Sequence, residues 1–104
     1  MQNRFLRLIT LMLALVLASG VMSAQTRKIT GQVVDERGMP LIGSVVASQD
    51  GKSGAMTDDK GEFSLNVRSN DQTVSVSFLG YLTQNVDIIG KNNVKVQLLP
   101  DPNN

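Results

Sequence analysis

The fold is decided by the stretch Ala55-Met56-Thr57-Asp58-Asp59-Lys60-Gly61-Glu62-Phe63-Ser64-Leu65. Polar residues ending in a glycine occupy its centre, and the alternation of polar and apolar residues after them is typical of a half-buried strand. The Asp58 carboxylate can accept hydrogen bonds from backbone N–H groups, and Gly61 can adopt the positive φ that closes a turn. We therefore expect a hairpin of strand, turn and strand, with Phe63 as its apolar anchor.

The same arrangement occurs earlier, in Val33-Val34-Asp35-Glu36-Arg37-Gly38-Met39-Pro40-Leu41. Asp35 again precedes a glycine, Gly38, by three residues at the end of an apolar run. Two such turns in a short chain favour a small all-β domain.

The first residues have the composition of an export signal. Arg4 and Arg7 precede the apolar run 8–18, and small residues follow, ending in Ser23 and Ala24. This order is typical of a secretory signal peptide, so residues 1–24 are predicted to be one, with cleavage after Ala24. The alternative, a membrane anchor, requires about 18–20 uninterrupted apolar residues, which the run does not reach.

Charge and cysteine content limit the remaining function classes. The chain has ten Lys and Arg residues and nine Asp and Glu residues. Because Arg4 and Arg7 lie in the predicted leader, the mature chain has eight basic against nine acidic residues, a net charge of −1. Such a chain has no basic excess to attract nucleic acid. The sequence has no cysteine, so one domain, residues 25–100, must fold on its apolar core without disulfides, followed by a tail at 101–104.

From residue 28 onward, apolar residues recur at every second position, as in strands rather than helices. Strands are predicted over 28–35, 43–48, the two flanks of the hairpin, 73–78, 84–88 and 94–98. Turns are predicted at Arg68-Ser69-Asn70-Asp71 and, through the bend that Gly80 allows, before Tyr81, and the segment 49–54 has the composition of a loop. Seven short strands separated by turns are the pattern of a β-sandwich.

Four motifs in this order add a family resemblance: Ile29-Thr30-Gly31-Gln32-Val33-Val34-Asp35, Gly38-Met39-Pro40-Leu41-Ile42-Gly43, Thr57-Asp58-Asp59-Lys60-Gly61-Glu62-Phe63 and Val76-Ser77-Phe78-Leu79-Gly80-Tyr81. Together they resemble the carboxypeptidase-regulatory-like domain, as found at the N-terminus of SusC/RagA-type TonB-linked outer-membrane transporters. The resemblance covers residues 28–100. It implies a seven-stranded transthyretin-like (prealbumin-like) β-sandwich without catalysis or cofactor, located in the periplasm at the outer membrane of a Gram-negative bacterium. The partners it implies are the transporter's plug and barrel and the TonB system.

The chain departs from the transporter pattern after Pro100, where the family continues into a TonB-contact segment, a plug and a barrel. A barrel of about 22 strands needs several hundred residues, so these 104 cannot form one. We expect a fragment of a longer transporter, and a free-standing domain is the alternative.

Each motif has a possible functional interpretation and a structural one, and we weigh the two against each other. Asp35, Asp58 and Asp59 could bind Ca²⁺, but alignment of Gly61 with the glycine of an EF-hand loop places Met56 at the first ligand position. Phe63, Phe78 and Tyr81 could stack on sugar rings, but core packing is the preferred interpretation in a chain with few aromatics. The residues expected to form turns and core, without a catalytic, cofactor or metal role, are Asp35, Gly38, Pro40, Gly43, Thr57, Asp58, Gly61, Phe63, Phe78, Gly80 and Tyr81.

Catalysis is not expected, because the sequence lacks both histidine and cysteine. Three functions remain. The first is a transporter accessory domain that binds protein through a strand edge or loops. The second is a carbohydrate-binding module, and the third is a structural spacer.

Overall fold

A computed structural model describes residues 2–19 and 25–103. Its one helix in these ranges, α1 (Gln2–Ser19), covers most of the predicted leader. No helix in the described ranges has the length and apolarity needed to cross a membrane. The predicted cleavage site after Ala24 and the end of the tail at Asn104 lie outside the described residues.

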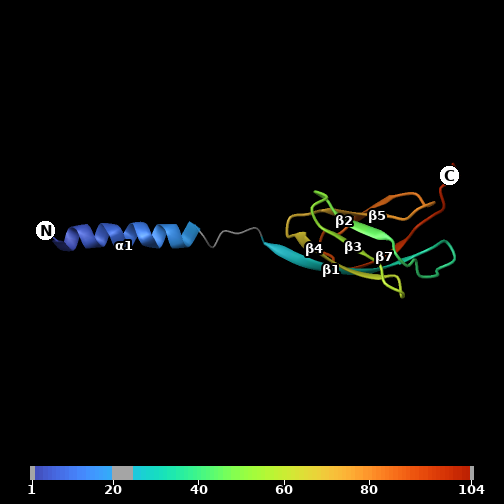
Figure 1. Ribbon diagram of the computed structural model, residues 1–104, viewed down its shortest axis with the longest axis horizontal. Helices are drawn as coiled ribbons and strands as arrows, with labels where there is room; N and C mark the ends of the chain where they lie inside the picture. The colour runs from blue at the N-terminus through green and yellow to red at the C-terminus, as the bar shows by residue number, and fades with distance from the viewer. Residues whose placement is uncertain (1, 20–24, 104) are drawn as a thin grey trace.

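Residues 25–103 form two β-sheets that pack face to face (Figure 1). One sheet has three strands in the order β4-β1-β7, and the other has four in the order β3-β2-β5-β6. The strands are β1 (Thr26–Val34), β2 (Val45–Ser48), β3 (Gly54–Met56), β4 (Glu62–Arg68), β5 (Thr73–Ser77), β6 (Gln84–Asp87) and β7 (Asn93–Gln97). This arrangement confirms the all-β sandwich expected from the two-residue alternation.

Strand β1 is the centre of the three-stranded sheet. It pairs antiparallel with β4, Gly31 opposite Phe63, and parallel with β7, Gly31 opposite Val94. A parallel pair needs a long connection, and here everything from β2 to β6 lies between its two strands. The start and the end of the domain are thereby joined in one sheet.

The core lies between the sheets and follows the alternation of each strand. In β4, Phe63, Leu65 and Val67 are buried while their neighbours are exposed. The Phe63 ring covers Gly31, where an added Cβ would lie 2.6 Å from the ring carbons. Full burial of each such side chain contributes about 1.5–3 kcal/mol. The buried core residues are Ile29, Val33, Leu41, Val46, Phe63, Leu65, Val67, Val74, Val76, Ile88, Val94, Val96 and Leu98.

The predicted hairpin at 55–65 is wrong, because its two flanks belong to different sheets. Strand β3 pairs with β2, and β4 pairs with β1. The Thr57 N–H donates to Ser44 O at 2.9 Å, which extends the first ladder, and the Val33 N–H donates to Gly61 O at 2.7 Å, which extends the second. Residues 57–61 therefore cross from one sheet to the other. The crossing lets Ala55 and Phe63 approach the same core from different sheets.

Replacement of Phe63 by alanine is expected to lower the free energy of unfolding by about 3–5 kcal/mol, because it removes a buried ring and leaves a cavity over Gly31. Urea denaturation followed by far-ultraviolet circular dichroism measures this loss. The matched control is Leu79→Ala, since Leu79 is 91% exposed and its removal should change stability by no more than about 0.5 kcal/mol. A loss below about 1 kcal/mol for Phe63→Ala would contradict the packing described.

Candidate functional site

The motif residues of the sequence gather at one end of the sandwich. We call this the motif end and define it as residues 35–43, 57–61 and 78–81. In Figure 1 these loops lie at the end opposite to the start of β1, near the C-terminus. A hydrogen bond joins two of these segments, because the Gly43 N–H donates to Thr57 O at 3.1 Å, and the Leu41 N–H ties the 35–43 loop to β1 by donating to Val33 O at 3.0 Å.

Two turns of the motif end have the same geometry. Asp35 Oδ1 accepts hydrogen bonds from the Arg37 and Met39 N–H groups, both at 2.9 Å. Asp58 Oδ1 accepts from the Lys60 and Glu62 N–H groups, also at 2.9 Å. Each turn ends at a glycine with positive φ, 84° at Gly38 and 73° at Gly61. Both carboxylates are therefore bound by the backbone of their own turns.

Thr57 is the buried polar residue of this end. Its Oγ1 accepts a hydrogen bond from the Ser44 N–H at 2.9 Å and donates to the Leu41 carbonyl. Pro40 forms an isolated bridge with Val34 and lies directly against Gly61. Gly43, with φ 83°, leads the chain from this loop toward β2. Thr57 thus ties the 35–43 loop to the 57–61 crossing.

Phe78, Gly80 and Tyr81 form the third part of the motif end. The two rings pack with their centroids 5.7 Å apart at an interplanar angle of 56°. Gly80 has φ 86°, and its carbonyl accepts a hydrogen bond from the Asp101 N–H at 3.0 Å. Burial and the neighbouring Glu36 carboxylate raise the pKa of Tyr81. Both rings are half-buried against the core, which does not favour a stacking platform for sugars.

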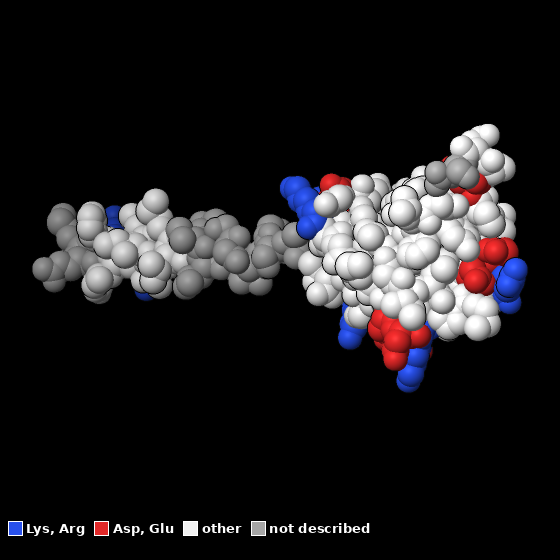
Figure 2. All heavy atoms as spheres, turned by 45° about the vertical axis from the view of Figure 1, so that its right-hand side comes forward, with Lys and Arg blue, Asp and Glu red and all other residues white. Residues whose placement is uncertain are grey.

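Acidic side chains of the described residues are dispersed and do not form a cluster. Within residues 2–19 and 25–103, no three His, Cys, Asp or Glu side chains are grouped so that they could hold a metal ion. Asp58 and Asp59 are exposed, and the Asp58 Oδ1 already accepts two N–H groups. Figure 2 shows acidic and basic side chains interspersed at the rim of a largely uncharged face. Such a distribution produces no large field of one sign.

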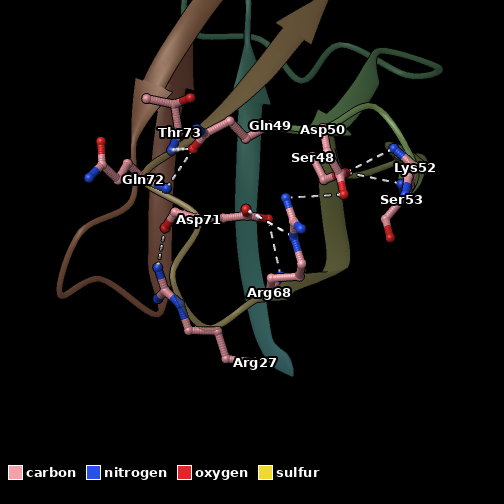
Figure 3. A network of polar contacts seen from close by, with 10 residues as sticks. All are labelled: Arg27, Ser48, Gln49, Asp50, Lys52, Ser53, Arg68, Asp71, Gln72 and Thr73. Carbon is pink, nitrogen blue, oxygen red and sulfur yellow. Dashed lines mark hydrogen bonds and ion pairs between the residues drawn. The ribbon is translucent and has the colours of Figure 1, made fainter. Parts of the chain in front are cut away.

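The opposite end contains a polar network that the sequence analysis missed (Figure 3). The Arg27 guanidinium donates to Lys91 O at 2.7 Å, Ile88 O at 2.8 Å and Asp71 O at 3.4 Å. It thereby joins β1 to the two turns before β5 and β7. The sequence does predict the turn at 68–71, but nothing in it indicates that an arginine of another strand binds the turn's carbonyls.

Buried and half-buried carboxylates complete this network. The Asp71 side chain is 3% exposed, accepts the Arg68 N–H at 3.1 Å and lies 3.6 Å from Arg68 Nε. Asp50 lies 3.4 Å from the same guanidinium. Hydrogen bonds from the Lys52 N–H and the Ser48 hydroxyl, together with the Arg68 charge, lower the pKa of Asp50. All these contacts hold the loops at this end of the sandwich in place.

Comparison with known proteins identifies the class. The family model described as "CarboxypepD_reg-like domain" matches residues 29–104, so the chain belongs to this family. The match includes both Asp-to-Gly turns, Phe63 and the Phe78–Tyr81 segment.

Three curated relatives are TonB-dependent receptors. The chain is 37% identical over 71 residues to the TonB-dependent receptor SusC of Bacteroides thetaiotaomicron, which is 68% of this chain and 7% of the relative. It is 28% identical over 94 residues to the TonB-dependent receptor P3 of Formosa agariphila, 89% of this chain and 9% of the relative. It is 30% identical over 71 residues to P39 of the same organism, 68% of this chain and 7% of the relative. The chain therefore spans less than a tenth of the length of these receptors.

The two turn glycines provide a matched pair of substitutions. Both have positive φ, but a Cβ at Gly61 would meet Val33 O at 2.5 Å and Pro40 Cβ at 3.0 Å, whereas a Cβ at Gly38 would meet nothing within 4 Å. Gly38→Ala should cost about 1–2 kcal/mol from backbone strain alone. Gly61→Ala should cost at least about 3 kcal/mol, because the crossing must also move away from β1. Equal losses in urea denaturation would contradict the close contact at Gly61.

Asp50 is expected to contribute to the pH dependence of stability. Its pKa is lowered from the ordinary value of 3.8 when the chain folds. The contribution of the Asp50 carboxylate to the free energy of unfolding is therefore complete above pH 3.8, and it is lost as the pH falls through the pKa of the folded state. Asp50→Asn should therefore be less stable than the wild type at pH 6, with a difference that shrinks below the ordinary value of 3.8. Thermal unfolding between pH 2 and pH 6 measures this. A difference that does not change with pH would contradict the assignment.

Proposed function

We propose that the chain is a non-catalytic accessory domain of a TonB-dependent outer-membrane nutrient transporter and that it acts in the periplasm by binding protein. The observation that carries this proposal is the family match over residues 29–104, together with relatives that are TonB-dependent receptors. The partners would be the plug and barrel of the transporter, and through them the TonB system.

The predicted leader supports the location. Residues 1–24 have the order of a signal peptide, with Arg4 and Arg7 before an apolar run. We propose that they direct export and are removed, and that residues 25–100 form the functional domain.

The surface supports protein contact rather than catalysis. The sequence has no histidine or cysteine, and Asp35 and Asp58 each accept two backbone N–H groups. By contrast, the motif end exposes three apolar side chains: Met39 and Ile42 are each 60% exposed and Leu79 is 91% exposed. Apolar groups that gather on a surface are typical of an interaction site. We propose that this end contacts the transporter.

Deletion of codons 25–100 with the leader retained tests the role in the native host. Growth is measured on a panel of oligosaccharides as sole carbon sources, and transporter abundance in the outer membrane is followed by immunoblot. We expect growth on at least one oligosaccharide to be lost and its uptake, measured with the labelled sugar, to fall at least about tenfold, with the transporter still present. Leu79→Asp should reproduce the defect, since it places a charge in the proposed contact.

The control is Ile89→Asp, which changes an equally apolar side chain, 60% exposed, outside the motif end. It should leave uptake unchanged. Normal uptake after the deletion would support a structural spacer instead. Saturable binding of an oligosaccharide by the purified chain, measured by calorimetry, would support a carbohydrate-binding module.

A further inference from the structure

Strand β4 is an edge of the three-stranded sheet, and its register shows which backbone groups are free. The Ser69 N–H donates to Gln25 O at 2.9 Å and the Val33 N–H donates to Gly61 O at 2.7 Å. In an antiparallel ladder with this register, the odd-numbered residues of β4 bond to β1 and the even-numbered ones direct N–H and C=O outward. An exposed row of this kind is a template for another strand.

The two ends of this row are closed by turns of the same chain. Glu62 exchanges hydrogen bonds with Asp58 through both backbone groups, at 2.9 Å each. At the other end, the Arg68 N–H donates to Asp71 Oδ2 at 3.1 Å, and the Asp71 N–H donates to Arg68 O at 3.0 Å. The open part of the β4 edge is therefore Ser64 and Asn66.

We propose that two copies of the chain pair antiparallel through β4, about a two-fold axis at Leu65. In this register, Ser64 of each copy faces Asn66 of the other, and the outward N–H and C=O groups of these residues meet as hydrogen-bonded pairs. The two three-stranded sheets then join into one continuous sheet. The pairing is isologous and closes at two copies.

Charge supports a second copy as the occupant of this edge. The same register places Glu62 of each copy opposite Arg68 of the other, and an opposite-charge pair across two strands is stabilising. The net charges near the two ends of β4 also differ in sign. Asp58, Asp59 and one cation, Lys60, lie in the turn before Glu62. Arg27 and Lys28 of β1 lie beside the end at Arg68, whose half-exposed guanidinium also contacts Asp50 and Asp71. An antiparallel pair brings the acidic end of each copy to the basic end of the other.

Space beside the edge is also available. A shallow hollow of about 700 Å³ lies over the three strands of this sheet, with residues 93–95 of β7 and 30–32 of β1 in its lining. It reaches Glu62 and Ser64 of β4 and also Met56, which is 66% exposed. A second strand along β4 would cover part of this apolar side chain. Burial of apolar area is a favourable term in association.

The other edge of the same sheet, β7, offers no comparable charge complementarity for self-pairing. In β7, the Leu98 N–H donates to Val34 O at 2.9 Å, and the Thr30 N–H donates to Asn92 O at 3.0 Å, so Asn93, Lys95 and Gln97 direct their backbone groups outward. A two-fold antiparallel pair centred on Lys95 places two lysines opposite each other, and like charges directly opposite are destabilising. A pair centred on Val94 or Val96 places Lys95 opposite Asn93 or Gln97, which brings no opposite charges together, and the Gln97 carbonyl already accepts a hydrogen bond from Gln84 Nε2 at 2.7 Å. The edges of the other sheet, β3 and β6, are strands of only three and four residues, whereas β4 has seven and is open in its middle, at Ser64 and Asn66.

Sedimentation equilibrium of the exported chain, purified from the periplasm, tests the proposal. We expect a monomer–dimer equilibrium with a dissociation constant below about 1 mM. This constant should rise as salt is added, because salt screens the attraction between Glu62 and Arg68. Ser64→Pro removes an outward N–H and should raise the dissociation constant at least about tenfold. Lys95→Pro is the matched control, because it removes an outward N–H of β7, and should change the constant by less than about twofold.

Glu62→Arg provides a second variant that leaves the backbone unchanged. It places two cations opposite each other and should also raise the dissociation constant at least about tenfold. If Ser64→Pro does not fold by circular dichroism, Glu62→Arg decides the outcome. A chain that stays monomeric to about 1 mM, or a dimer that Glu62→Arg leaves intact or Lys95→Pro abolishes, would overturn the proposal.

Discussion

The contact between the Phe63 ring and Gly31 is the constraint on which the rest of the sandwich depends. Gly31 is the point where the three strands of one sheet meet, opposite Phe63 in β4 and Val94 in β7. A Cβ there would lie 2.6 Å from the ring and also against the Val94 carbonyl, so no side chain fits. The glycine weakens the strand locally, and the neighbouring ring replaces the missing packing. One large side chain thus fills the position that its cross-strand partner leaves empty.

The crossing at 57–61 follows from the same contact. Phe63 occupies the core from the sheet of β1, so the chain must leave the sheet of β2 and β3 before it reaches this residue. Gly61 allows the crossing because it has no side chain, and a Cβ at this position would collide with Val33 O and Pro40. Thr57 holds the other side through Ser44 and Leu41. The carboxylates of Asp35 and Asp58 shape the two turns by accepting backbone N–H groups.

Local sequence features predicted most strands and turns, but they did not predict which strands pair with each other. Alternation identifies the buried face of a strand, and an aspartate three residues before a glycine identifies a turn, because both depend on neighbours in the chain. Whether two flanks pair with each other depends on which sheet each of them completes. The Asp58–Gly61 turn is compatible with a hairpin and with a crossing. The Arg27 network was missed for a similar reason, since its acceptors Ile88 and Lys91 are carbonyls more than 60 residues away.

Solution NMR of the exported chain gives the most direct test of this packing. The account predicts nuclear Overhauser effects between the Phe63 ring protons and the Gly31 Hα protons, and cross-strand contacts that link β3 to β2 and β4 to β1. Contacts that pair residues 54–56 directly with 62–65 as a hairpin, without any between Phe63 and Gly31, would contradict it.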